Sequence, residues 1–262
     1  MTMAVMPSDR STTLVDIVFP GDTNHHGTLF GGVGLAHMDK VAFIAASRHA
    51  AVDFVTASCE RIDFAEPARV GDILEFTGRV VRVGRRSLAV EVEMIAEAPL
   101  SGERRRCSRG VFNMVAVARP PTAGEWRLPQ LADGPFQDPP DALRMVDLVF
   151  PEQTSHYGSL YGGNALALMA KAAFVRATRH SRRSVVMAAT QRADFDSQIH
   201  KGEVVEVSPR VVGVGQSSMT VEVELVAENL RTGARRHCGL ARFVMVALDR
   251  EQQPTPVLRP AG

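Results

Sequence analysis

An amide, two glycines and a carboxylate follow one another in residues 22–40 of this chain. Asn24 lies in a polar stretch, Gly31-Gly32 comes next, and Asp39 stands in a run of Ala, Met and Leu that predicts a helix. Backbone N–H groups at a helix start favour an oxygen that gains negative charge, and a glycine lets another group approach them. A carboxylate can act as a general base toward water. These residue types suit hydrolysis of an activated acyl group such as a thioester, which needs no strong nucleophile.

The spacing of these groups limits how they can work together. Gly32 and Asp39 are seven residues apart, so they share a helix face but lie about 10 Å apart along it. Within one domain the N–H of Gly32 and the carboxylate of Asp39 are too far apart to act on the same carbonyl group. We therefore expect an active site shared between domains. Taken singly, Asp39 is also explained as a surface carboxylate and Asn24 as a turn residue. Their combination favours catalysis, with Asn24 orienting the water or polarising the carbonyl.

The same segment occurs twice in the chain. A shift of 131 residues aligns 15–49 with 146–180 without a gap, and 20 of the 35 positions are identical. The second copy also places two glycines before a helical run, so Gly32 and Gly163 are both candidates for stabilising an oxyanion. Because each copy has the length of a complete domain, the repeat predicts two tandem domains rather than a solenoid.

The predicted organisation divides the chain into two domains, a linker and a tail. The parts are a first domain at 10–120, a Pro-rich linker at 121–141, a second domain at 142–250 and a tail at 251–262. Each domain combines one long helix with a run of strands, which predicts an α+β fold with the helix packed on an antiparallel sheet. In the first copy we expect strands at Leu14–Phe19, Ser58–Phe64, Asp72–Val83, Ser87–Ala96 and Ser108–Ala118, and a helix from about Gly32 to His49.

Composition excludes several classes of function. Thirty basic and 29 acidic residues give a net charge of +1, which offers no argument for binding nucleic acid or a membrane surface. The three cysteines have no metal-binding spacing, and the eight histidines form no convincing ligand set, so we expect no metal. With no secretory signal and no apolar run long enough to span a bilayer, we expect a cytoplasmic protein.

The motif Asn24-x-x-Gly27-x-x-Phe30-Gly31-Gly32, followed by Met38-Asp39, resembles that of the double-hotdog acyl-CoA thioesterases, the cytosolic acyl-CoA hydrolase family. The resemblance covers nearly the whole chain apart from the linker and tails. It implies two tandem hotdog domains, each a long helix wrapped by an antiparallel sheet. It also implies an active site whose Asn and Asp come from opposite sides of a domain pair. Carried over to this chain, the catalytic candidates are Asn24 and Asp39.

The same resemblance implies how substrate binds and how chains assemble. The turn Gly84-Arg85-Arg86-Ser87 is similar to the family's CoA-contacting segment, and Ser218 is the repeat partner of Ser87. Arg85 and Arg86 are placed to meet nucleotide phosphates, although a solvated turn explains them equally well. No cofactor is implied beyond the CoA of the substrate. The family resemblance further suggests a homo-oligomer, namely three double-hotdog chains in a ring.

The second copy departs from the motif at both catalytic positions. Ser155 stands in the place of Asn24, and Ala170 stands in the place of Asp39. Three outcomes are compatible with this: a site of Asp39 with Ser155 or His156 in the Asn role, pairing of first domains between two chains, or loss of activity. We expect the first.

Three functions fit these residues. The leading one is hydrolysis of acyl-CoA to free acid and CoA by general-base activation of water. A hotdog enoyl-CoA hydratase is an alternative because Gly21-Asp22-Thr23-Asn24 resembles the start of that family's Asp/His motif, but Gly27 stands where its histidine is needed. Non-catalytic binding of acyl-CoA is the third, since the second copy lacks Asn and Asp.

Overall fold

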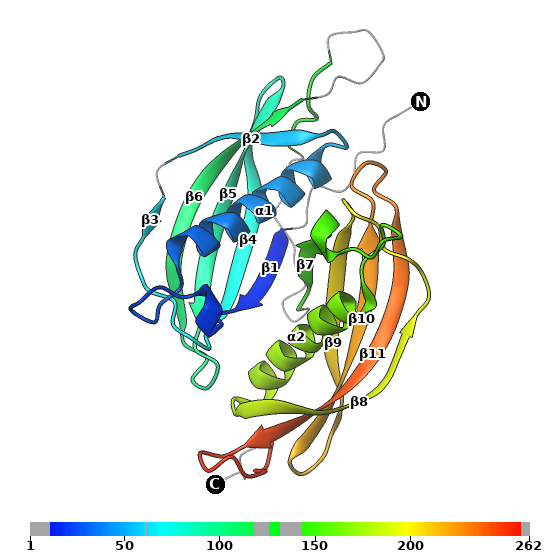
Figure 1. The fold of residues 1–262 in the computed structure, drawn as a ribbon. Helices are drawn as coiled ribbons and strands as arrows, with labels where there is room; N and C mark the ends of the chain where they lie inside the picture. The colour runs from blue at the N-terminus through cyan, green and yellow to red at the C-terminus, as the bar shows by residue number, and fades with distance from the viewer. Residues whose placement is uncertain (1–10, 61, 118–125, 132–142, 258–262) are drawn as a thin grey trace. The chain divides into compact units, whose positions relative to one another are not determined.

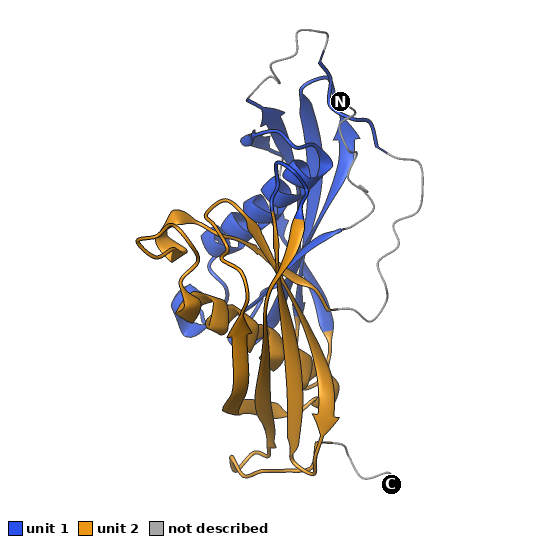
Figure 2. Cartoon of the chain, turned by 90° about the vertical axis from the view of Figure 1, so that its right-hand side faces the viewer, with its two compact units in different colours: residues 1–96, 104–142, 229–234 blue, residues 97–103, 143–228, 235–262 orange. Residues whose placement is uncertain are grey.

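The structure is a computed structural model that describes residues 11–60, 62–117, 126–131 and 143–257 (Figure 1). The chain forms two compact units (Figure 2). Unit 1 comprises residues 1–96, 104–142 and 229–234, and unit 2 comprises residues 97–103, 143–228 and 235–262. Most of the predicted linker and the end of the predicted tail lie outside the described residues.

Unit 1 consists of one long helix and one antiparallel sheet. Its elements are β1 (Thr12–Ile17), η1 (Pro20–Asp22), α1 (Gly31–His49), β2 (Phe54–Cys59), β3 (Asp63–Phe64), β4 (Ile73–Val83), β5 (Ser87–Glu97) and β6 (Arg104–Ala116). The strands follow the order β1-β4-β5-β6-β2, and the short β3 also pairs with β6. Along this path β1, β4, β5 and β6 come in sequence order, and β2 closes the far edge beside β6.

Unit 2 repeats this arrangement. Its elements are β7 (Met145–Leu148), η2 (Pro151–Gln153), α2 (Gly162–Ser181), β8 (Ser184–Phe195), β9 (Val204–Val214), β10 (Ser218–Glu228) and β11 (Arg235–Leu248). The single strand β8 takes the place of both β2 and β3, because its last two residues, Asp194 and Phe195, pair with β11 as Asp63 and Phe64 of β3 pair with β6. The strand order is β7-β9-β10-β11-β8, which matches unit 1 position for position. In both units the helix lies along one face of its sheet (Figure 1). The expected α+β fold of two tandem hotdog domains is therefore confirmed.

The core of unit 1 lies between α1 and the sheet. Met38, Val41 and Ile44 of α1 are fully buried, and small alanines between them let the helix approach the strands closely. On β5 the alternation seen in the sequence appears as burial, because Val90 and Val92 are buried between half-buried glutamates. The alternation of apolar and acidic residues in the sequence thus correctly predicts which side chains of β5 are buried in the core.

Two predicted strands are wrong in their bounds. β6 begins at Arg104, four residues before the expected start at Ser108. The run Ser58–Phe64 was expected as a single strand, but β2 begins earlier, at Phe54, and ends at Cys59, and β3 covers only Asp63–Phe64. β2 lies at the edge of the sheet, and every residue after Phe54 is exposed. Because such a strand buries neither face, it shows no hydrophobic alternation from which its start could be predicted.

We expect Gly78→Ala to destabilise the protein by about 1–3 kcal/mol, because overpacking a filled core costs that much. A Cβ at Gly78 on β4 would lie 2.6 Å from Cγ1 of Val41, which is itself fully buried under the helix. Gly21→Ala is the matched control, since its Cβ would meet nothing within 4 Å. Urea unfolding of the two variants measures the difference, and equal midpoints would contradict this packing.

Candidate functional site

The loop before α1 is held closed by the side chain of Asn24. Its Oδ1 accepts hydrogen bonds from the backbone N–H groups of His26 (2.9 Å) and Thr28 (3.4 Å), and its Nδ2 donates to Thr28 Oγ1 (3.0 Å). The backbone N–H of Asn24 also donates to the Thr28 carbonyl, and Gly27 takes a φ of +72°, which only glycine adopts readily. The amide predicted to touch substrate therefore also shapes its own loop.

Unit 2 forms the same loop with a shorter side chain. The N–H of Ser155 donates to the Ser159 carbonyl (2.8 Å), and Gly158 takes a φ of +74°. Ser155 Oγ accepts from the N–H of Tyr157 (3.3 Å) and lies 3.4 Å from Ser159 Oγ. His156 is exposed and its ring lies 3.8 Å from the ring of Tyr157, centroid to centroid. The loop geometry thus survives the loss of the asparagine.

Both helices begin at the predicted glycine pairs. α1 starts at Gly31 and α2 at Gly162, so the N–H groups of Gly32 and Gly163 belong to the first turn, where the helix supplies no acceptor for them. No side chain caps either helix start by a hydrogen bond. A Cβ at Gly32 would lie 2.6 Å from the ring of the preceding aromatic residue, Phe30, so the glycine leaves the space that this ring uses.

The carboxylate of Asp39 is held by a partner on β2. Thr56 Oγ1 donates a hydrogen bond to Asp39 Oδ1 (2.6 Å) and also lies 3.5 Å from Met114 Sδ. Asp39 is half-buried on α1, and Thr56 is exposed. The bond fixes the carboxylate's orientation and leaves its second oxygen for another proton.

Sequence reasoning missed Thr56, although the repeat carries a signal for it. At the 131-residue shift Thr56 aligns with Met187, just as Asp39 aligns with Ala170. Both members of the hydrogen-bonded pair are therefore replaced together by groups that can neither donate nor accept strongly. Within unit 1 Asn24 and Asp39 have separate partners, and Ser155 and His156 belong to unit 2.

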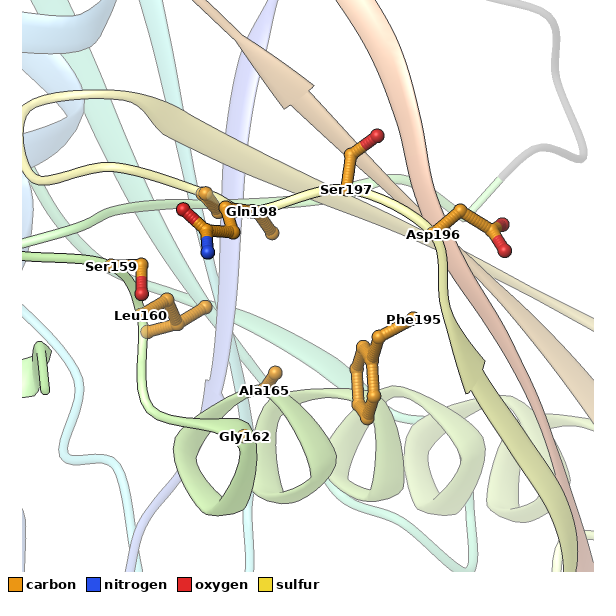
Figure 3. A pocket seen from close by; sticks show the side chains of 9 residues that line it. Ser159, Leu160, Gly162, Ala165, Phe195, Asp196, Ser197 and Gln198 are labelled. Atoms are coloured by element: carbon orange, nitrogen blue, oxygen red, sulfur yellow. The ribbon is translucent and has the colours of Figure 1, made fainter. Parts of the chain in front are cut away.

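A cavity of about 290 Å³ opens beside the start of α2 in unit 2 (Figure 3). Its lining residues are Ser159, Leu160, Gly162, Ala165, Phe195, Asp196, Ser197, Gln198 and Ile199. The amide of Gln198 and the hydroxyl of Ser159 face the cavity from one side, whereas the carboxylate of Asp196 points away (Figure 3). Sequence reasoning placed Gly163 at this helix start but missed the cavity and Gln198.

An ion pair holds the rim of this cavity. Arg236 donates to both carboxylate oxygens of Glu203 (2.7 and 2.6 Å) and to the backbone carbonyl of Gln198 (2.5 Å). Burial alone would raise the pKa of the Glu203 carboxyl, but hydrogen bonds from Arg236 and the His200 N–H lower this pKa below its usual value. The rim segment is thus tied to the sheet through a charged pair.

The turns predicted to contact CoA have the same backbone but different side chains. The N–H of Gly84 donates to the Ser87 carbonyl (2.7 Å), and in unit 2 the N–H of Gly215 donates to the Ser218 carbonyl (2.8 Å). Arg85 is exposed, and the Arg86 guanidinium donates to the Ala116 carbonyl (3.3 Å). At the matching positions the second turn carries Gln216-Ser217, so only the first turn is basic.

Among the described residues, no group of three or more His, Cys, Asp or Glu side chains gathers as metal ligands would. In the same part of the chain, no helix is long and apolar enough to cross a membrane.

Comparison with known proteins decides the family. The model of the thioesterase superfamily matches residues 26–102 and again residues 157–234. The chain belongs to the thioesterase superfamily. Each match includes the helix of one repeat and the strands that follow it as far as β5 or β10, so both units are thioesterase domains.

Two relatives match this thioesterase over nearly its whole length, and a third matches part of it. A crystal structure of an acyl-CoA hydrolase from Agrobacterium tumefaciens is 52% identical, covers 94% of this chain and 97% of that one, and superposes with a TM-score of 0.85. The cytosolic acyl coenzyme A thioester hydrolase of Mus musculus is 23% identical over 290 residues, which cover 94% of this chain and 76% of the mouse protein. An acyl-CoA thioester hydrolase of Bacillus subtilis is 39% identical over 100 residues, 38% of this chain and 58% of that protein.

The ion pair at the cavity rim makes stability depend on pH. We expect Glu203→Gln to cost about 2 kcal/mol at pH 7, typical of a hydrogen bond to a charged group. Because the pKa of Glu203 is lowered in the folded state, its contribution is complete above the unfolded-state pKa of about 4.5 and disappears as pH falls through the folded-state value. Unfolding of both proteins between pH 7 and pH 3 measures this, and a difference that stays constant with pH would contradict it.

Proposed function

We propose that this thioesterase hydrolyses acyl-CoA to a free acid and CoA, with Asp39 as the general base. The observation that carries the proposal is the hydrogen-bonded Asp39–Thr56 pair in a chain that belongs to the thioesterase superfamily. The acyl-CoA hydrolase from Agrobacterium tumefaciens, at 52% identity over nearly both full lengths, supports CoA esters as the substrate class.

In the proposed reaction Asp39 removes a proton from water, and the hydroxide oxygen bonds to the thioester carbonyl carbon. The carbonyl oxygen gains the negative charge and is stabilised by N–H groups at a helix start. The carbon–sulfur bond then breaks, and the proton on Asp39 passes to the departing CoA sulfur. Thr56 keeps the carboxylate oriented through both proton transfers.

The helix start that serves Asp39 is not its own. Seven residues of helix separate Gly32 from Asp39, a distance of about 10 Å, which is too long for both to contact one carbonyl group. We infer that Gly163 supplies the oxyanion donors to Asp39, because α2 keeps its glycine pair although its own repeat lacks a base at Ala170. In this proposal Ser155 or His156 orients the water, in the role of Asn24.

Asn24 belongs to the other half of the proposed arrangement. With Gly32 it forms a helix start of the same kind, whose counterpart in the second repeat has lost its carboxylate. We therefore propose one fully equipped site per chain and assembly into a homo-oligomer, with three double-hotdog chains in a ring. The name of the mouse relative supports the cytosol as the place of action.

Release of free thiol from a panel of saturated acyl-CoAs tests the activity. We expect Asp39→Asn to lower kcat by about 10²- to 10⁴-fold, the usual contribution of a positioned general base. Glu60→Gln is the matched control, since Glu60 is an exposed unit 1 carboxylate that lies 3.7 Å from the exposed Arg82.

Three results would overturn the proposal. No thiol from any chain length would leave acyl-CoA binding without catalysis. Water addition to crotonyl-CoA without thiol release would favour the hydratase. Full activity of Asp39→Asn would remove Asp39 from the mechanism.

The basic turn of unit 1 gives a second prediction. We propose that Arg85 and Arg86, with Ser87 and its repeat partner Ser218, contact the nucleotide phosphates of CoA. The variant in which both arginines become alanine is expected to raise KM for acyl-CoA about tenfold or more and to leave kcat close to wild type, because this binding is equal in the ground and transition states.

Substrate truncation supplies the control for this turn. Acyl-N-acetylcysteamine thioesters keep the reacting carbonyl but lack the phosphates, so their KM should be the same in both proteins. A rise in KM for both substrate types would show that the turn acts on something other than the nucleotide.

A further inference from the structure

Compared with the first repeat, the second repeat lacks one side-chain amide and has another at a different position. Asn24 of unit 1 aligns with Ser155, whereas Pro67 of unit 1 aligns with Gln198. Gln198 lines the cavity at the start of α2, and its side-chain amide faces the space together with the Ser159 hydroxyl (Figure 3). Ser159 in turn is the residue that Ser155 contacts, Oγ to Oγ at 3.4 Å. Gln198 therefore lines the same cavity as Ser159, the residue that contacts the position of the lost asparagine.

We propose that Gln198 is a further catalytic residue, whose side-chain N–H donates a hydrogen bond to the carbonyl oxygen of the thioester bound in this cavity. The inference deepens the proposed function and rests on it. Gln198 Nε2 would act with the N–H groups at the α2 start, so that the developing oxyanion receives donors from two directions. The amide keeps its hydrogens throughout, and no bond to the protein forms.

The backbone around Gln198 is fixed on several sides, as a preorganised donor requires. Arg236 donates to the Gln198 carbonyl at 2.5 Å while held by Glu203. On either side of Gln198, the N–H of Leu160 donates to the Ile199 carbonyl (2.7 Å), and the N–H of Asp196 donates to the Cys238 carbonyl (2.9 Å). The amide is therefore presented from a segment that is bonded to the loop before α2 and to β11.

The rest of the lining suits a thioester rather than a charged ligand. Leu160, Ala165, Phe195 and Ile199 supply apolar surface, and about 290 Å³ holds the reacting end of the substrate but not the nucleotide. A carboxylate in the cavity would repel the oxyanion, but Asp196 points away and lies 3.0 Å from His237 Nδ1 (Figure 3). Polar groups that face the space can thus donate a hydrogen bond.

The experiment compares Gln198→Ala and Gln198→Glu with wild type by thiol release. Loss of one oxyanion donor costs about 10²- to 10³-fold in kcat in a buried site. We expect a loss of about tenfold or more here, with KM changed by less than about threefold, because the bond strengthens only in the transition state. The near-isosteric glutamate variant should lose at least as much, since a carboxylate cannot donate. Gln253→Ala, in the C-terminal segment outside the cavity, should match wild type.

Restoring the lost amide provides a readout that a structural role would not move. Ser155→Asn places an asparagine in a loop that already has the backbone of the Asn24 loop. In the Gln198→Ala background we expect Ser155→Asn to recover kcat severalfold, and the unfolding midpoints of all variants to stay near wild type.

Each other outcome overturns the inference. A kcat for Gln198→Ala within about twofold of wild type, or a rise in KM alone, would remove the amide from the transition state. Failure of the proposed function is distinct, because then wild type itself releases no thiol or Asp39→Asn remains fully active.

Discussion

The rise of an α-helix is the constraint on which the site depends. Seven residues hold Gly32 and Asp39 about 10 Å apart on α1, and no side-chain rotation closes that distance. In the proposed mechanism the carboxylate of Asp39 and the start of α1 therefore serve two different substrate molecules. The carboxylate needs its own local support, and Thr56 on β2 gives it that support at 2.6 Å. In the proposed mechanism unit 1 therefore carries two separate half-sites, the helix start after Asn24 and the carboxylate of Asp39 with Thr56.

The two repeats keep what builds the scaffold and differ in what does the chemistry. An acidic residue and an arginine are paired at the same place in both, Asp72 with Arg105 (2.6 Å) and Glu203 with Arg236. In unit 1 the pair uses one carboxylate oxygen for the arginine, whereas the longer Glu203 takes two bonds from Arg236, which also reaches the Gln198 carbonyl. The pair that stabilises the rim is therefore also the one that presents the gained amide.

The sequence predicted the parts of this structure that obey a local rule. The glycine pair and the apolar run placed the start of α1 to within one residue, and alternation placed β5. β2 obeys no such rule, because it lies at an edge with nearly all its residues exposed, and so its start and Thr56 were missed. Gln198 was missed because the cavity depends on a loop, a helix start and a strand end that meet only in the folded unit.

Because the two domains are joined in one chain, the second repeat can lack the asparagine and the aspartate without loss of the proposed site. In a symmetric pair of identical domains every copy must carry both half-sites, because each copy serves as donor and as base. Once two copies are covalently joined, each partner is always present at high effective concentration, and one copy can specialise. Unit 1 then retains the carboxylate, its threonine and the basic turn at Arg85-Arg86, whereas unit 2 retains the helix start and acquires Gln198. In the proposed site unit 2 supplies no base, so the replacement of Asp39 and Thr56 by Ala170 and Met187 removes a polar pair that this mechanism does not use, and leaves no unpaired carboxylate behind.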